Sequence, residues 1–100
     1  MEKYKVILSP PAQRDFMSVV EHLRALTDEE AKDCIKQIVD KANVLPKTPF
    51  AYPFTRDAQL RLRGYRILAT DAFLFFYVVF GNTAEIRRIL PAKRQYDWLL

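Results

Sequence analysis

A chain of 100 residues, half of them hydrophobic, is long enough for one domain with a single core. Its longest apolar run has eight residues, which is too short for a transmembrane helix, and its N-terminus lacks the cleavage site of a signal peptide. The single cysteine cannot form an internal disulfide and fits a reducing compartment. We therefore expect one cytoplasmic domain over residues 1–100, without membrane association.

The net charge of +4 is unevenly distributed along the chain. Residues 1–45 carry seven Lys/Arg against eight Asp/Glu, whereas residues 46–100 carry nine against four. Concentrated positive charge favours a polyanionic partner, either nucleic acid or an acidic protein. A solvated, solubilising surface is the plain alternative, and charge alone does not separate the two.

The chain begins with a predicted strand and helix. Residues 4–8 alternate partly between polar and apolar side chains, and Pro10 then stops the strand because proline cannot donate to a ladder. Apolar residues recur at spacings of three and four through residues 11–26, which indicates one face of an amphipathic helix. Ser9 is placed to cap that helix.

A second helix follows almost without a linker. Thr27 and Glu30 have the spacing of a capping box, and an apolar stripe runs from there until Pro46. Two amphipathic helices this close predict a hairpin whose apolar side covers a sheet. Residues 46–58 then form a packed irregular loop, anchored to the core by its aromatic side chains Phe50, Tyr52 and Phe54.

The second half predicts a three-strand meander. Residues 73–80 are apolar or aromatic without interruption, which is typical of a central strand covered on both faces. Before it, residues 60–68 begin with alternating leucines and arginines and are interpreted as a basic strand. After it, Gly81-Asn82 predicts a two-residue turn, and residues 83–90 form the last strand. The alternation of that strand breaks at Arg87-Arg88, which predicts a bulge.

This order of elements indicates an α+β fold. An N-terminal strand, a helical hairpin and an antiparallel three-strand meander together complete a four-stranded sheet.

No pattern indicates a metal or a cofactor. His22 lies off the apolar stripe of the first helix and has no second ligand in its sequence neighbourhood, so we interpret it as an idle surface residue. Cys34 lies on the apolar stripe of the second helix, where a free cysteine behaves as a small hydrophobe. Two glycines in the whole chain leave no glycine-rich phosphate loop. We therefore expect no metal and no cofactor.

Several motifs together resemble the RelE/ParE superfamily of toxins from bacterial type II toxin–antitoxin modules. The resemblance covers essentially the whole chain, and it lies in the order and spacing of motifs that are weak one by one. The matching residues are Tyr4-Lys5-Val6, Ser9-Pro10, Ala12, Asp15, Gly64-Tyr65-Arg66, Leu74-Phe75-Phe76-Tyr77, Ile86-Arg87-Arg88-Ile89-Leu90, Lys93-Arg94 and Tyr96.

The resemblance implies a toxin that a cognate antitoxin neutralises. RelE-like toxins cut mRNA in the ribosomal A site, and ParE-like toxins inhibit DNA gyrase. Our leading hypothesis is a ribosome-dependent mRNA endonuclease that inhibits translation. The alternative is a non-catalytic inhibitor of gyrase, and a plain nucleic-acid-binding module is a third possibility. An amphipathic antitoxin helix with an acidic flank is expected to lie across the sheet and the helical hairpin and to cover part of the basic surface.

Metal-free RNA cleavage needs cations that stabilise the charge on phosphorus and a group that assists the leaving oxygen. Arginine suits the first task and tyrosine the second. The candidate catalytic residues are Arg66, Arg88, Arg94 and Tyr96, of which Arg66, Arg94 and Tyr96 are expected to converge; Glu85 is a candidate base. The candidate nucleic-acid-binding residues are Arg61, Arg63, Arg87 and Lys93.

Two positions depart from the RelE-like pattern. Leu74 stands where RelE-like toxins carry an arginine on the central strand, and Pro91 stands where some family members carry a histidine. Both departures favour the gyrase alternative.

Overall fold

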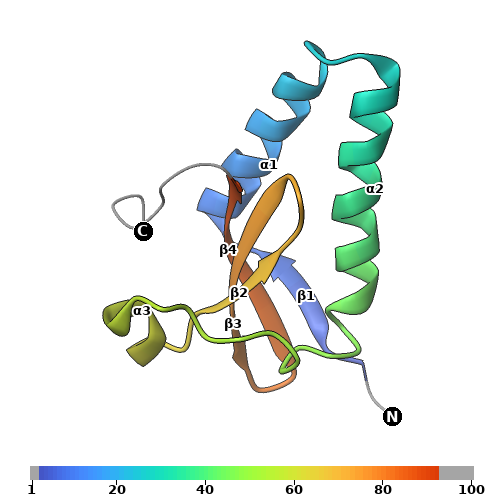
Figure 1. Cartoon of the computed structure of the whole chain (residues 1–100). Helices are drawn as coiled ribbons and strands as arrows, with labels where there is room; N and C mark the ends of the chain where they lie inside the picture. Colours follow the sequence, from blue (N-terminus) through green and yellow to red (C-terminus); the bar gives the residue numbers. More distant parts are fainter. Residues whose placement is uncertain (1–2, 93–100) are drawn as a thin grey trace.

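The structure, a computed structural model, describes residues 3–92 and shows a mixed four-stranded sheet with two long helices on one face (Figure 1). The strands lie in the order β1-β4-β3-β2, in which β1 is parallel to β4 and the other pairs are antiparallel. The elements are β1 (Lys5–Leu8), α1 (Pro10–Leu23), α2 (Asp28–Val44), α3 (Ala58–Leu62), β2 (Arg66–Ala69), β3 (Phe73–Phe80) and β4 (Thr83–Pro91). The predicted fold class is confirmed.

Strand β3 occupies the inside of the sheet, as its unbroken apolar sequence predicts. It lies between β4 and β2, and its first six residues are buried. Phe75 and Tyr77 face the helices and belong to the main core, while Leu74 and Phe76 face the other way in a second, smaller cluster. Polar alternation is missing because both faces of this strand are covered.

Both long helices begin with the predicted caps. The Ser9 hydroxyl accepts a hydrogen bond from the Ala12 N–H at the start of α1. Thr27 and Glu30 form a complete capping box at the start of α2. The two helices run antiparallel as a hairpin (Figure 1). Yet none of the α2 residues is buried, and Ile35 and Val39 each stay 48% exposed, so the outer helix covers the core only loosely.

The strand predicted for residues 60–68 starts later than expected. Residues 58–62 form the short helix α3, and the strand β2 begins at Arg66. Asp57 caps this turn by accepting a hydrogen bond from the Leu60 N–H, and the Leu60 side chain is buried. Gly64 then adopts a φ of +83°, which lets the chain turn into β2 at Arg66. Two leucine–arginine repeats fit both a strand and one helical turn, so the pattern alone does not distinguish them. The cap at Asp57 favours the helix.

The loop before α3 is only partly anchored in the predicted way. Tyr52 packs against the main core, but Phe50 and Phe54 are 56% and 45% exposed. The prediction that all three aromatic residues are buried anchors is therefore wrong for these two phenylalanines. The backbone also holds the loop, because the Ile67 N–H donates to the Pro53 carbonyl.

A buried tyrosine also ties this loop to the sheet. The hydroxyl of Tyr77 donates a 2.7 Å hydrogen bond to the Pro49 carbonyl, and the side chain is fully buried. Burial raises the pKa of Tyr77 to about 12, because the phenolate would lose its hydration.

We expect Tyr77→Phe to lower the free energy of unfolding by about 1–2 kcal/mol at pH 7, because the Pro49 carbonyl loses its donor. The neutral phenol is favoured in the folded state, so stability from Tyr77 is present below pH 10 and is lost as the pH rises towards 12. Urea unfolding at several pH values measures this. The advantage of the wild type should shrink above about pH 10; a constant difference up to pH 12 would contradict it.

Candidate functional site

The predicted bulge lies in β4 at Arg87. Phe76 pairs with Arg88 and Tyr77 with Ile86, so Arg87 is the extra residue. Phe76 faces away from the helices, and the bulge brings Arg87 to that same face. Two consecutive arginines that would point to opposite sides of a regular strand are thereby brought together.

Arg87 is held by two neighbours on this face. Its Nε donates a 2.8 Å hydrogen bond to Glu85 Oε1, and its guanidinium lies 5.5 Å from the centre of the Tyr65 ring. Hydrogen bonding to Tyr65, and then to Glu85, raises the pKa of Arg87. Glu85, the candidate base, is therefore engaged by a cation.

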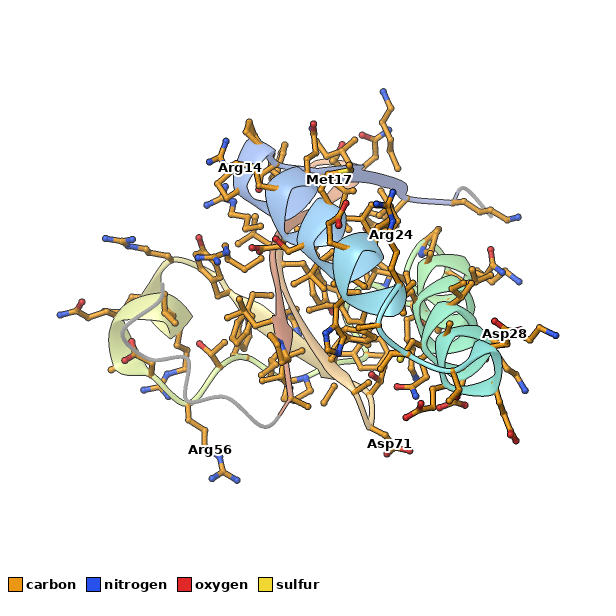
Figure 2. The ribbon with its side chains drawn as sticks, turned by 90° about the horizontal axis from the view of Figure 1, so that it is seen from above. Arg14, Met17, Arg24, Asp28, Arg56 and Asp71 are labelled. Carbon is orange, nitrogen blue, oxygen red and sulfur yellow. The ribbon has the colours of Figure 1, made fainter. Side chains whose placement is uncertain are left out.

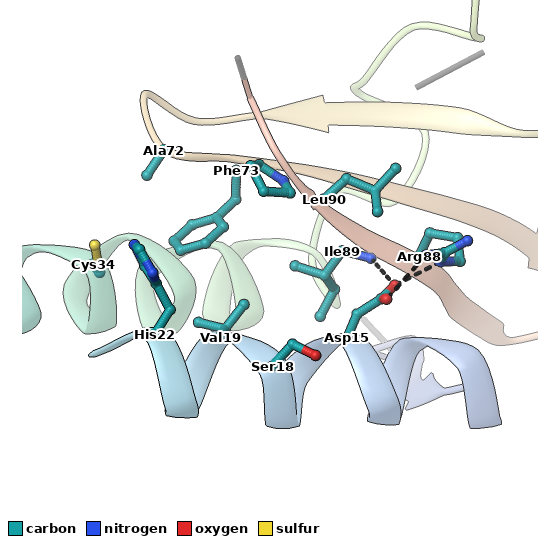
Figure 3. A pocket seen from close by; sticks show the side chains of 11 residues that line it. Asp15, Ser18, Val19, His22, Cys34, Ala72, Phe73, Arg88, Ile89 and Leu90 are labelled. Atoms are coloured by element: carbon teal, nitrogen blue, oxygen red, sulfur yellow. Dashed lines mark hydrogen bonds and ion pairs between the residues drawn. The ribbon is translucent and has the colours of Figure 1, made fainter. Parts of the chain in front are cut away.

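Arg88 forms a two-pronged ion pair with Asp15 of α1 (Figure 3). Its Nε lies 2.7 Å from Asp15 Oδ2 and its Nη2 3.1 Å from Oδ1, and this pairing raises the pKa of Arg88. The same Oδ2 accepts a 2.9 Å hydrogen bond from the Ile89 N–H. Asp15 therefore provides a hydrogen-bond acceptor for the backbone of β4 beyond the point where β1 ends.

Arg66 is committed to the loop before α3. Its guanidinium lies 4.0 Å from the centre of the Phe54 ring and 5.3 Å from that of Phe50, and its Nη1 donates a 2.7 Å hydrogen bond to the Tyr52 carbonyl. The two exposed rings and the arginine thus form a stack against the edge of β2.

The candidate catalytic arginines Arg66 and Arg88 are engaged at different parts of the fold. Arg66 contacts Phe54 and the Tyr52 carbonyl in the loop before α3, whereas Arg88 is paired with Asp15 of α1.

The remaining candidates divide between α3 and the end of the chain. Arg61 and Arg63 are exposed on and beside α3 rather than on a strand. Lys93, Arg94 and Tyr96 lie outside the described residues, so their convergence with Arg66 stays a prediction.

A cavity of about 400 Å³ opens between the helical hairpin and the ends of β3 and β4 (Figure 3). His22 and Cys34, which the sequence placed on separate helices without a role, both line it opposite Phe73 and Ile89. The antiparallel hairpin is the signal that could have brought them together. Within residues 3–92, no group of three His, Cys, Asp or Glu side chains could hold a metal ion, and no helix is long and apolar enough to cross a membrane.

Asp15 is the residue that sequence reasoning undervalued. It entered only as part of a motif, yet it joins α1 to the unpaired edge of β4. Nothing in the sequence marks a carboxylate as the partner of an arginine 73 positions away.

Comparison with solved structures shows which fold this is. The sequence matches no family model and none of the curated protein sequences. The structure is similar to the chromosomal ParDE toxin–antitoxin system of Pseudomonas aeruginosa, with a TM-score of 0.70 at 19% identity over 91% of this chain and 98% of that chain. It is also similar to the RelBE2 toxin–antitoxin complex of Mycobacterium tuberculosis, with a TM-score of 0.63 at 19% identity over 94% and 97% of the two chains.

A third similar structure is the protein HP0894 of Helicobacter pylori, with a TM-score of 0.58 at 17% identity over 91% of this chain and 97% of that chain. At these identities the similarity concerns the fold: the chain has the RelE/ParE-like fold that its motifs predict.

We expect Asp15→Ala to lower the free energy of unfolding by about 2–3 kcal/mol, because it removes a charged acceptor from Arg88 and from the Ile89 N–H. Glu21→Ala is the matched control, since the Glu21–Arg24 pair is exposed on the same helix and should contribute less than about 1 kcal/mol. Urea unfolding compares the two. Equal losses would contradict the role given to Asp15.

We expect Arg66→Ala to lower the free energy of unfolding by about 1–2 kcal/mol, because the stack on Phe50 and Phe54 and the bond to Tyr52 are lost. Hydrogen exchange at the Ile67 N–H, which bonds to the loop, should also become faster. Arg63→Ala, on an exposed side chain of the same charge, should change stability by no more than about 0.5 kcal/mol. Identical behaviour of both variants would show that Arg66 does not hold the loop.

Proposed function

We propose that this protein is the toxin of a type II toxin–antitoxin module and that it acts by binding DNA gyrase rather than by cutting RNA. The observation that carries the proposal is that the two candidate catalytic arginines within the described residues are both engaged by other parts of the chain. Arg66 lies over the rings of Phe50 and Phe54, and Arg88 is paired with Asp15.

Catalysis of RNA cleavage needs cations and a proton acceptor around one phosphate. Arg66 contacts the loop before α3, Arg88 is paired with Asp15 of α1, and Glu85 is paired with Arg87. Leu74, at the position where RelE-like toxins carry an arginine, is buried in the smaller apolar cluster. These observations support a binding surface more than a reaction centre.

Neutralisation by an antitoxin is supported by the helical hairpin. Phe16, Ile35 and Val39 expose apolar surface there, and an almost wholly apolar groove of about 160 Å³ runs beneath α2 between Phe16 and Ala42. An amphipathic helix of the antitoxin would cover these exposed side chains and place an apolar side chain of its own in the groove.

A ribosome-dependent mRNA endonuclease is the second candidate, and the bulge in β4 favours it. The bulge places Arg87 beside Arg88 just before the segment that carries Lys93, Arg94 and Tyr96. In this case the last eight residues would have to supply the catalytic groups.

Two assays on the purified protein separate the candidates. We expect it to inhibit supercoiling by gyrase and to leave the message intact on programmed ribosomes, with primer extension used to map any cuts. Cleaved message would contradict the gyrase assignment.

If the protein is an endonuclease, Arg94→Ala should slow RNA cleavage by roughly thirty- to thousand-fold, which is the effect of losing one charge-stabilising donor. Arg14→Ala, on an exposed arginine of α1 outside both candidate sets, is the control and should leave the cleavage rate unchanged.

A further inference from the structure

Helix α3 forms a small projection on the side of the sheet away from the α1–α2 hairpin (Figure 1). Its base is rigidly attached: the Tyr65 N–H donates to the Leu60 carbonyl, and the Thr55 N–H donates to the Tyr65 carbonyl. Asp57 caps the helix, and the Leu60 side chain is buried. The projection is therefore preorganised and does not need to fold when it meets a partner.

The outer side of this projection carries Leu62, whose side chain is 87% exposed. Among the large hydrophobic residues that the structure describes, the next most exposed is Met17 at 60%. A single exposed leucine is ordinary on a protein surface. This one differs in its neighbours, because it stands on a fixed turn with three exposed arginines and a single acid.

Three exposed arginines lie on α3 or directly beside its ends. Arg56 extends away from the body when the molecule is seen from above (Figure 2). The Nη1 of Arg61 donates to the Arg56 carbonyl at 3.2 Å, and Arg63 follows the last helical residue. The ion pairs among the described residues include none of the three. The one acid of this segment, Asp57, is occupied as the helix cap.

The helical conformation of α3 determines the directions of the Arg61 and Arg63 side chains. Successive residues of an α-helix are rotated by about 100°, so Arg61 and Arg63 diverge on either side of Leu62. A phosphate backbone is matched by cations in a row on one face, as a strand would have presented them. Cations arranged around an apolar tip instead match a protein interface, in which a charged rim surrounds an apolar centre.

We propose that α3 docks into an acidic protein surface, with Leu62 in an apolar socket and Arg56, Arg61 and Arg63 against carboxylates at its rim. Arginine and a large apolar side chain are well suited to such a contact, since both are effective when water is excluded from the centre. This surface is separate from the apolar groove of the helical hairpin, and the inference does not depend on the toxin assignment.

Titration of the ¹⁵N-labelled protein with three probes tests the proposal. The first probe is a synthetic amphipathic helical peptide of leucines and glutamates. The second has the same charge with its leucines replaced by serine. The third is a single-stranded RNA of equal charge. We expect the leucine peptide to bind most tightly, with the largest chemical-shift changes at residues 60–64, and its affinity to fall with salt.

Leu62→Ser should weaken binding of the leucine peptide by about tenfold or more and leave the serine peptide unchanged, because only the apolar contact is lost. Phe80→Ser is the matched control, on an exposed apolar residue at the end of β3. It should leave the shifts at residues 60–64 unchanged. Charge reversal by Arg61→Glu with Arg63→Glu should weaken both peptides. Unfolding midpoints of all variants check that the fold is kept.

Three results would overturn the proposal. The first is equal affinity of wild type and Leu62→Ser for the leucine peptide. The second is that the leucine peptide fails to bind, or shifts only residues of α1 and α2. The third is tighter binding of the RNA at residues 60–64, which would assign the projection to nucleic acid. The gyrase and ribosome assays do not affect these outcomes, so the two proposals can fail separately.

Discussion

The attachment of α1 to the unpaired edge of β4 is the interaction on which the rest of the structure depends. Strand β1 pairs only with residues 83–86, while β4 continues to Pro91. Beyond that point, side chains of α1 and its cap replace the missing strand: the Ser9 hydroxyl donates to the Arg87 carbonyl, and Asp15 accepts from the Ile89 N–H. Unpaired backbone groups at a partly buried edge are costly, so these two residues fix where the helix lies.

That attachment determines the chemistry available at the sheet. Asp15 has a second task, because the carboxylate that accepts from Ile89 also neutralises Arg88. Arg87 is paired with Glu85, and Arg66 is stacked on the loop. Three of the nine Lys/Arg residues in the second half of the chain are thus used to hold the molecule together. It would be misleading to treat every arginine there as a contact for nucleic acid.

Other positive charges of the second half of the chain are exposed at α3. Arg61 and Arg63 lie beside an exposed leucine on a projection, with the apolar helical hairpin on the other side of the molecule. Two separate surfaces of different character suit a protein that meets two partners. The division separates the surface proposed for the antitoxin from the surface proposed for an acidic protein.

The sequence by itself determined the features that depend on neighbouring residues. Eight consecutive apolar residues, rich in aromatic and β-branched side chains, indicate the strand β3 without reference to distant residues. The caps at Ser9 and Thr27 act within one helical turn. The interrupted alternation at Arg87 was enough to predict the bulge.

Only the tertiary structure decided which residues became partners. The leucines and arginines before Gly64 satisfy a strand and a helical turn equally well over so few positions, and burial of Leu60 with its cap selects the helix. Asp15 and Arg88 are 73 positions apart, and a charge carries no information about which opposite charge it will meet. Pairing of that kind is decided by the packing of α1 on β4, because a carboxylate and a guanidinium can bind only where the fold brings them within hydrogen-bonding distance.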